Sequence, residues 1–237
     1  MPARSDSLAR VKAEVVACTR CPRLVAWREQ AAREAPARYR GERYWARPLA
    51  GFGDPKARVL VVGLAPAAHG GNRTGRIFTG DRSGDWLFRA MHRAGFANQS
   101  TSVDKDDGLA LHDAYIAAVV RCAPPLNRPT TEERDMCLPY LERELKLLRR
   151  LKVVVALGSF AWDGFLKAAA ANGITMRPKP KFGHGARATV GPYALIGTYH
   201  PSQQNTFTGK LTEPMLDAIF TEALRLAVDS GARRSSS

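Results

Sequence analysis

Four short runs of apolar and β-branched residues recur along the chain, and each has the length of a buried strand. They are Arg58–Gly63, Tyr115–Val120, Lys152–Leu157 and Tyr193–Thr198. Each run is almost continuously hydrophobic, without the polar alternation of a half-exposed strand. This pattern is typical of parallel strands that are covered on both faces. The sequence therefore predicts a central sheet of four parallel strands.

Helical patterns, in which apolar residues recur three and four positions apart, alternate with these strands. They cover Ser83–Gly95, Thr130–Arg150, Ser159–Ala171 and a last helix capped by Thr212. Pro139 is expected to break or kink the second of these helices. The alternation predicts an α/β protein, with residues 1–237 forming a single three-layer α/β/α domain. The ends of the chain, residues 1–10 and 230–237, are expected to be disordered.

Parallel sheets bind ligands at the carboxyl ends of their strands, so the segments that follow the strands are the places to look for a site. The loop after the first strand contains Gly63, Ala65 and Ala67, whose small size would let a ligand approach the backbone. The same loop carries one unexpected aromatic residue, Phe78, in polar surroundings. Phe78 either contacts a ligand or anchors the loop to the core.

Two further strand ends carry side chains suited to recognition. Asn127 follows the second strand in a proline-rich loop, and an amide side chain can read the edge of a nucleobase. His200, at the end of the fourth strand and fixed by Pro201, could donate to a developing anion. Each residue taken alone is more often structural. Their convergence with Phe78 on one sheet edge favours a single site.

Charge adds a class of partner to this picture. The chain has 36 Lys and Arg residues against 22 Asp and Glu residues, a net charge of +14. Such an excess favours a polyanion, most simply nucleic acid, although an Arg- and Ala-rich genome composition is the alternative explanation. No segment approaches the about 20 apolar residues of a membrane span, and the N-terminus lacks a secretory signal. We therefore expect a soluble cytoplasmic protein with no membrane partner.

The cysteines form one pattern. Cys18 and Cys21 make a C-x-x-C pair, and Cys122 and Cys137 follow a hundred residues later. Four thiolates can complete the coordination of zinc or of an iron–sulfur cluster, and spacing alone does not choose between them. Two disulfides or four buried apolar cysteines are the alternatives, which an intracellular protein makes less favourable.

The chain resembles the uracil-DNA glycosylase superfamily, and within it the family 5 (type b) iron–sulfur enzymes. The matching segments are GLAPA at 63–67, GRIFTGDRSG at 75–84, RCAPPLN at 121–127, HPS at 200–202, QNTFTG at 204–209 and the four cysteines. The resemblance extends from about Cys18 to the last helix. It implies a DNA repair enzyme that flips uracil out of the helix, hydrolyses its glycosidic bond and so initiates base excision repair.

The resemblance also implies roles for individual residues. Phe78 would stack on the extruded base, Asn127 would bind its Watson–Crick edge, and His200 would stabilise the departing anion. Asp81 is the candidate for orienting water, with capping of the helix at Ser83 as its structural alternative, and His69 is a second, weaker candidate. Gln204, Asn205 and Phe207 are the candidates for filling the vacated base stack.

Further expectations concern cofactor and substrate. The resemblance implies a 4Fe–4S cluster with a structural role. It also implies a monomeric enzyme that acts on double- and single-stranded DNA and is associated with the prokaryotic nucleoid. The apolar stretch Ala65–Ala67 predicts loose base selection, so that hypoxanthine, xanthine or ethenocytosine would also be removed. A non-catalytic metal-containing nucleic-acid-binding module and a phosphate-ester hydrolase are the competing interpretations.

Overall fold

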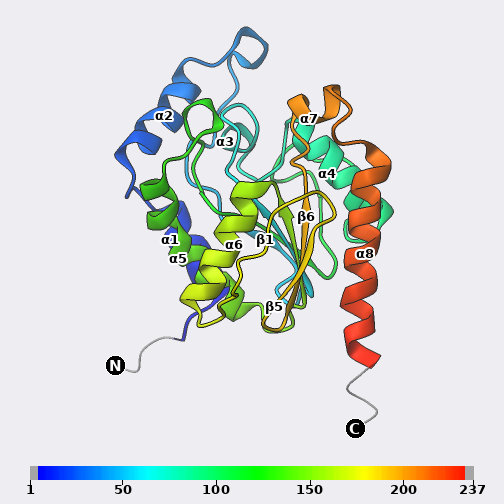
Figure 1. The fold of residues 1–237 in the computed structure, drawn as a ribbon. Coiled ribbons are helices and arrows are strands. Elements are labelled where there is room, and N and C mark those ends of the chain that lie inside the picture. The colour runs from blue at the N-terminus through cyan, green and yellow to red at the C-terminus, as the bar shows by residue number, and fades with distance from the viewer. Residues whose placement is uncertain (1–4, 233–237) are drawn as a thin grey trace.

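The protein is a six-stranded sheet between two layers of helices (Figure 1). The structure is a computed structural model that describes residues 5–232. The strand order is β1-β3-β2-β4-β6-β5. The four central strands are parallel: β2 (Val59–Gly63), β3 (Ala114–Ala118), β4 (Val153–Leu157) and β6 (Tyr193–Thr198). They confirm the predicted parallel core. Two edge strands that the pattern did not predict, β1 (Phe52–Gly53) and β5 (Arg187–Val190), pair in antiparallel fashion.

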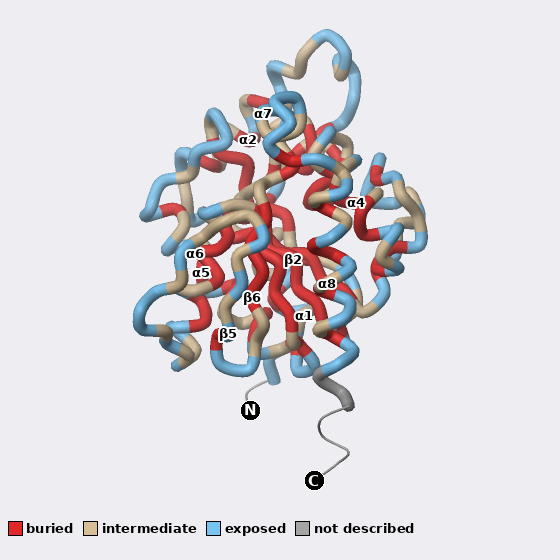
Figure 2. The backbone as a smooth tube through the Cα atoms, turned by 45° about the vertical axis from the view of Figure 1, so that its right-hand side comes forward, coloured by how far each residue is buried: buried red, intermediate tan, exposed pale blue. Residues whose placement is uncertain are grey.

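Successive residues of the central strands enter two separate cores. In β2, Val59 and Val61 pack in the core beneath α4 (Arg82–Arg93) and α8 (Glu213–Ala232). Leu60 and Val62 pack in the core beneath α5 (Thr131–Leu147) and α6 (Ser159–Ala171). Figure 2 shows the resulting buried centre, with the exposed loops around it. Both faces of the strands are therefore covered, which explains their continuous hydrophobicity.

The remaining helical segments lie before the sheet or at the carboxyl ends of its strands. They are α1 (Leu8–Val16), α2 (Pro22–Arg33), η1 (Ala37–Tyr39), α3 (Gly71–Thr74), η2 (Pro125–Asn127) and α7 (Gln203–Phe207). Val11 and Val15 of α1 pack against Tyr140 of α5. Arg143 of α5 donates to Asp6 at 2.7 Å and pairs with Glu14. This packing brings the N-terminal segment, with its two cysteines, beside α5.

Two predictions about helices and chain ends differ in part from the structure. Pro139 does not break its helix, because α5 runs without interruption from Thr131 to Leu147. The proline removes one backbone hydrogen bond, but Leu138 and Leu141 on either side of it are buried in the core and hold the helix in place. Residues 8–10 are the start of α1 and residues 230–232 the end of α8, not disordered tails. Residues 5–7 precede α1, with Ser7 as its N-cap, and residues 1–4 and 233–237 lie outside the described residues.

Within residues 5–232, no helix is both long enough and apolar enough to cross a membrane.

Candidate active site

A cavity of about 610 Å³ opens where the parallel strands end, and we call it the main cavity. Its walls come from the loop after β2, from η2 after β3 and from the segment after β6. Sequence-predicted residues from all three segments line it: Ala65, Ala67, Phe78, Asp81, Asn127, His200 and Gln204. The structure therefore brings together side chains that are more than a hundred residues apart in the chain.

Phe78 and His200 lie side by side on the wall of the main cavity. Their ring centroids are 5.8 Å apart and the ring planes differ by 31°. Phe78 is only 6% exposed and belongs to the core beneath α4, so it anchors the loop and faces the cavity at once. Gly63 does not line the cavity. A Cβ atom at Gly63 would stand 2.7 Å from Phe78 Cζ, so this glycine leaves room for the ring.

His200 is held by its backbone at the end of β6. Its carbonyl oxygen accepts hydrogen bonds from Asn205 Nδ2 and from the Ser202 amide, both at 2.8 Å. Burial lowers the pKa of His200 to about 4, because the surrounding protein disfavours the charged imidazolium. The ring is therefore neutral at physiological pH and can act as an uncharged hydrogen-bond donor toward the cavity.

Asp81 combines the two alternatives that the sequence left open, because it caps a helix and also faces the site. It is the N-cap of α4, where its Oδ1 accepts a hydrogen bond from the Gly84 amide at 3.0 Å. It also lines the main cavity. Burial raises the pKa of the Asp81 carboxyl above its ordinary value, against the lowering effect of the backbone hydrogen bonds. A carboxylate with a raised pKa in a cavity is a good candidate for accepting a proton.

Asn127 is presented to solvent by a strained turn. Leu126 and Asn127 both have positive φ, 54° and 55°, in the left-handed region that costs non-glycine residues energy. The turn leaves Asn127 exposed on the cavity wall and leaves Leu126 82% exposed beside it. The exposure of Leu126 was not predictable from the sequence, because a single leucine in a proline-rich loop resembles an ordinary core residue.

The segment after His200 is a short helix, α7, and its three candidate residues differ in placement. Gln204 lines the main cavity. The Asn205 side chain is turned inward to the His200 carbonyl oxygen. Phe207 is 66% exposed, with the Arg82 guanidinium 4.4 Å from its ring centroid. Of the three, Phe207 presents the largest exposed apolar surface.

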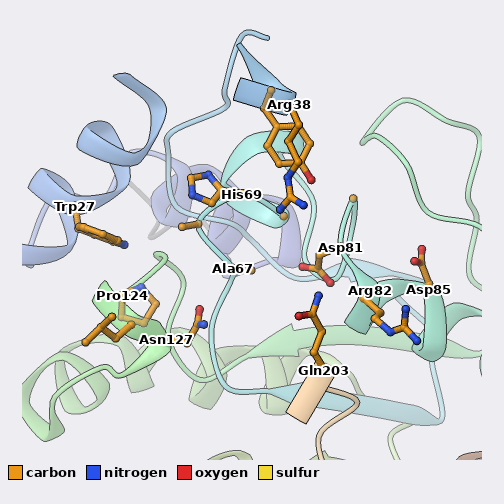
Figure 3. Close-up of a pocket in the computed structure, with 15 residues that line it drawn as sticks. Trp27, Arg38, Ala67, His69, Asp81, Arg82, Asp85, Pro124, Asn127 and Gln203 are labelled. Atoms are coloured by element: carbon orange, nitrogen blue, oxygen red, sulfur yellow. The ribbon is translucent and has the colours of Figure 1, made fainter. Parts of the chain in front are cut away.

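His69 lies in a second cavity of about 580 Å³ that adjoins the main one, and we call it the side cavity (Figure 3). Its Nδ1 lies 3.0 Å from the Tyr44 hydroxyl oxygen, within hydrogen-bond distance. Burial, followed by the charges of Arg38 and Arg73, lowers the pKa of His69. The structure thus separates His69 from the main cavity that holds Phe78 and His200.

The four cysteines line one small cavity between the N-terminal segment and α5, and no disulfide links them. Arg28 Nη1 donates to Cys122 Sγ, and the Arg121 amide donates to Cys137 Sγ, both at 3.3 Å. Burial raises the pKa of Cys122 to about 11 and that of Cys137 to about 12. Such thiols need a bound cation to become thiolates near neutral pH.

The four cysteines have the donor chemistry of a metal or iron–sulfur site. Within residues 5–232, no three His, Cys, Asp or Glu side chains are placed to hold one metal ion. In a 4Fe–4S cluster each of four thiolates binds a different iron atom. Four cysteines around one cavity, with the cations Arg20 and Arg121 also on its wall, have the donor chemistry that such a cluster requires.

Residues 50–224 match the family model of the Uracil DNA glycosylase superfamily, and the chain belongs to this superfamily. Its relatives narrow the assignment. A type-5 uracil-DNA glycosylase of Mycobacterium tuberculosis is 51% identical, over 94% of this chain and 83% of that protein. One of Thermus thermophilus is 50% identical, over 90% of this chain and 95% of that protein. By contrast, a type-4 uracil-DNA glycosylase of Pyrobaculum aerophilum is 28% identical, over 81% of this chain and 87% of that protein. Within the superfamily, the chain is one of the type-5 uracil-DNA glycosylases.

Proposed function

We propose that this single-domain protein acts as a monomer on single- and double-stranded DNA in the prokaryotic cytoplasm, where it removes uracil and initiates base excision repair. The observation that carries the proposal is the meeting of Phe78, Asn127 and His200 in the main cavity, each from a different strand end. An aromatic face, an amide and a neutral imidazole are the groups needed to stack, read and release a flipped base. The net charge of +14 suits a DNA substrate.

In the proposed reaction the flipped uracil stacks on Phe78 and its edge pairs with Asn127. The bond between C1′ and N1 breaks, its electron pair stays on the base, and His200 donates a hydrogen bond to the uracil anion at O2. Water then adds to C1′ and gives up its proton to the Asp81 carboxylate. Oriented donors of this kind usually supply the largest part of the rate acceleration, because charge develops in a site with little water.

The proposed activity is tested with a labelled duplex that carries one U·G pair, followed by hot alkali and a denaturing gel. We expect strand cleavage only after alkali, because hydrolysis of the base leaves an intact strand with an abasic site. Cleavage without alkali would contradict a purely hydrolytic enzyme. No release of uracil from a folded protein would contradict the proposed activity.

The proposed substrate range extends to other deaminated bases. The wall beneath the base is formed by Leu64, Ala65, Pro66 and Ala67, which place no polar side chain there. Apolar walls discriminate weakly between ligands, by about 10- to 200-fold. We therefore expect hypoxanthine to be excised within about 200-fold of uracil from otherwise identical duplexes. A larger preference for uracil would show that selection comes from another part of the site.

Asp81→Asn should lower kcat by about 10²-fold without a loss of stability. Asparagine caps helices as well as aspartate does, so the α4 cap remains while the proton acceptor is lost. Because the pKa of Asp81 is raised, wild-type activity should fall as the pH is lowered through that pKa, and the variant should lack this limb. Kinetics from pH 4 to 8 and thermal melts measure both effects.

Asp81→Ala is the matched control, since it removes the cap as well. We expect it to lose about 1 kcal/mol of stability in addition to activity. If Asp81→Asn kept full activity while Asp81→Ala lost it, the residue would be only a helix cap.

We further propose that Phe207 fills the space that the flipped base leaves, with Leu126 as a second apolar residue on the cavity rim. Leu126 is 82% exposed and lines the main cavity, and Phe207 is 66% exposed and contacts Arg82, which lines the same cavity. Unstacking costs a few kcal/mol in a duplex and much less in a single strand. Phe207→Ala should therefore slow excision from duplex DNA more than from single strands, and equal effects on both would contradict this role.

The proposed cofactor is a 4Fe–4S cluster held by Cys18, Cys21, Cys122 and Cys137. When bound, it would supply a covalent cross-link between distant segments. The chain's own contribution is to place Arg28 against Cys122, five residues before Asn127. In this way the cysteine cavity supports the turn that presents Asn127 to the base.

A further inference from the structure

The proposed reaction uses the main cavity and leaves the side cavity without a role. The two cavities adjoin each other, because six residues line both: Ala67, Asp81, Arg82, Leu126, Asn127 and Gln203. The side cavity is therefore the neighbouring space for a group that extends from a base in the main cavity. At about 580 Å³ the side cavity is much larger than a single water or phosphate requires.

Two aromatic residues, Trp27 and Tyr39, line the side cavity. Trp27 comes from α2 and Tyr39 from η1, and Figure 3 shows Trp27 on the α2 side of the cavity, away from Gln203. Both side chains are half-buried. Neither residue packs in the described hydrophobic cores. Half-buried aromatic rings on the wall of a basic protein's cavity are the usual stacking surfaces for unpaired bases.

Tyr39 is held in place by a fixed arginine. The Arg73 guanidinium carbon lies 4.1 Å from the centroid of the Tyr39 ring. Arg73 is in turn anchored by hydrogen bonds to the His69 carbonyl at 2.9 Å, the Gly80 carbonyl at 3.0 Å and Glu42 at 2.6 Å. The ring is therefore coupled to the loop that carries Asp81, so that a ligand stacked on Tyr39 would be positioned relative to the main cavity.

The charges around the side cavity match a nucleotide. Arg38 and Arg82 are exposed on its wall, and guanidinium groups pair well with phosphate. Arg38 also lies over the Tyr39 ring, with its guanidinium carbon 4.7 Å from the ring centroid, so a base that stacks on this ring has to displace the exposed Arg38 side chain while Arg73 stays in place. Two acidic residues, Asp81 and Asp85, also line the side cavity, both at the end of α4 that carries Arg82. The Arg38 side is thus the better place for a phosphate, next to the stacking ring.

We propose that the side cavity binds the nucleotide adjacent to the flipped uracil in the same strand, with its base unpaired and stacked on Tyr39. This inference depends on the proposed function, since it extends the same site by one nucleotide. It implies that the enzyme unpairs two neighbouring nucleotides rather than one. Single-stranded DNA should therefore bind most readily, because no base pair has to be broken.

The test is a binding titration with short single-stranded DNA that carries one uncleavable 2′-fluoro-deoxyuridine. In two further oligonucleotides, the base on the 5′ or on the 3′ side of the uracil is replaced by a tetrahydrofuran abasic analogue. For the wild type we expect the loss of one of these two bases to weaken binding by about 5- to 100-fold, the range of base–aromatic stacking. For Tyr39→Ala the same substitution should have almost no effect.

Tyr39→Phe is the matched variant, because it keeps the ring and should retain the full dependence on the neighbouring base. If Tyr39→Ala does not fold, Tyr39→Leu replaces it, because leucine also removes the aromatic ring. Equal dependence in the wild type and in Tyr39→Ala, or a Tyr39 effect that occurs only in duplex DNA, would overturn the inference. Binding does not require turnover, so an absence of uracil excision would count against the proposed function alone.

Discussion

His200→Ala should lower the rate of uracil excision by about 10²- to 10³-fold, the usual effect of removing one donor to a developing anion. DNA binding should change little, because phosphate contacts supply most of the affinity for DNA. Single-turnover excision of uracil and a binding titration on the same duplex measure the two quantities. His112→Ala is a matched control, since His112 is exposed and lies outside both cavities.

The charge state of His200 leads to a further expected result of this variant. Because the pKa of His200 is about 4, the wild-type ring stays neutral from pH 5 to 8, and excision should show no titration of this histidine there. In the unfolded chain the pKa is about 6.5, so the unfolded state binds the proton more readily. Stability should therefore fall as the pH decreases from about 6.5 to about 4, and His200→Ala should lose less stability over that range.

Two outcomes would contradict the role of His200. If His200→Ala kept full activity, His200 would have only a structural role, as a packing partner of Phe78. A loss of DNA binding equal to the loss of excision would indicate that the residue contributes to substrate affinity rather than to the transition state. A non-catalytic DNA-binding module would show neither excision nor a dependence on His200.

Cys122→Ser should give a colourless protein that unfolds at a temperature lower by about 10 °C or more. Binding of a structural metal contributes on the order of 10 kcal/mol to folding. In a domain of this length, the loss of about a third of that free energy already lowers the melting temperature by about 10 °C. Iron and sulfide analysis, visible absorbance and thermal melts measure the effect. Excision should fall as well, because Cys122 precedes Asn127 by only five residues.

Cys137→Ser and the double variant sharpen this test. If both cysteines bind one centre, each single substitution should remove it, and the double variant should be little worse than either. Additive losses would indicate two buried thiols that act independently. A wild-type protein that contains zinc instead of iron would replace the proposed cluster with a zinc site. A stable, brown Cys122→Ser protein would contradict a ligand role for this cysteine.

The parallel core could be predicted from the sequence because its physical requirement is local. A strand that is covered on both faces must be apolar at every position, and β2 and β4 have that composition over their whole length. The edge strands β1 and β5 were not predictable in this way. β1 has only two residues, and β5 alternates exposed and half-buried positions at the edge of the sheet. Their strand conformation depends on pairing with β3 and β6.

The sequence by itself determined the order of the elements and the strand ends that carry Phe78, Asn127 and His200, because periodicity and polarity are properties of neighbouring residues. Only the tertiary structure decided how those side chains act together. Their separation, the burial that lowers the pKa of His200, the exposure of Leu126 and the side cavity beneath Tyr39 depend on segments distant in the chain. Such properties arise from packing between elements, and no local pattern of residues encodes them.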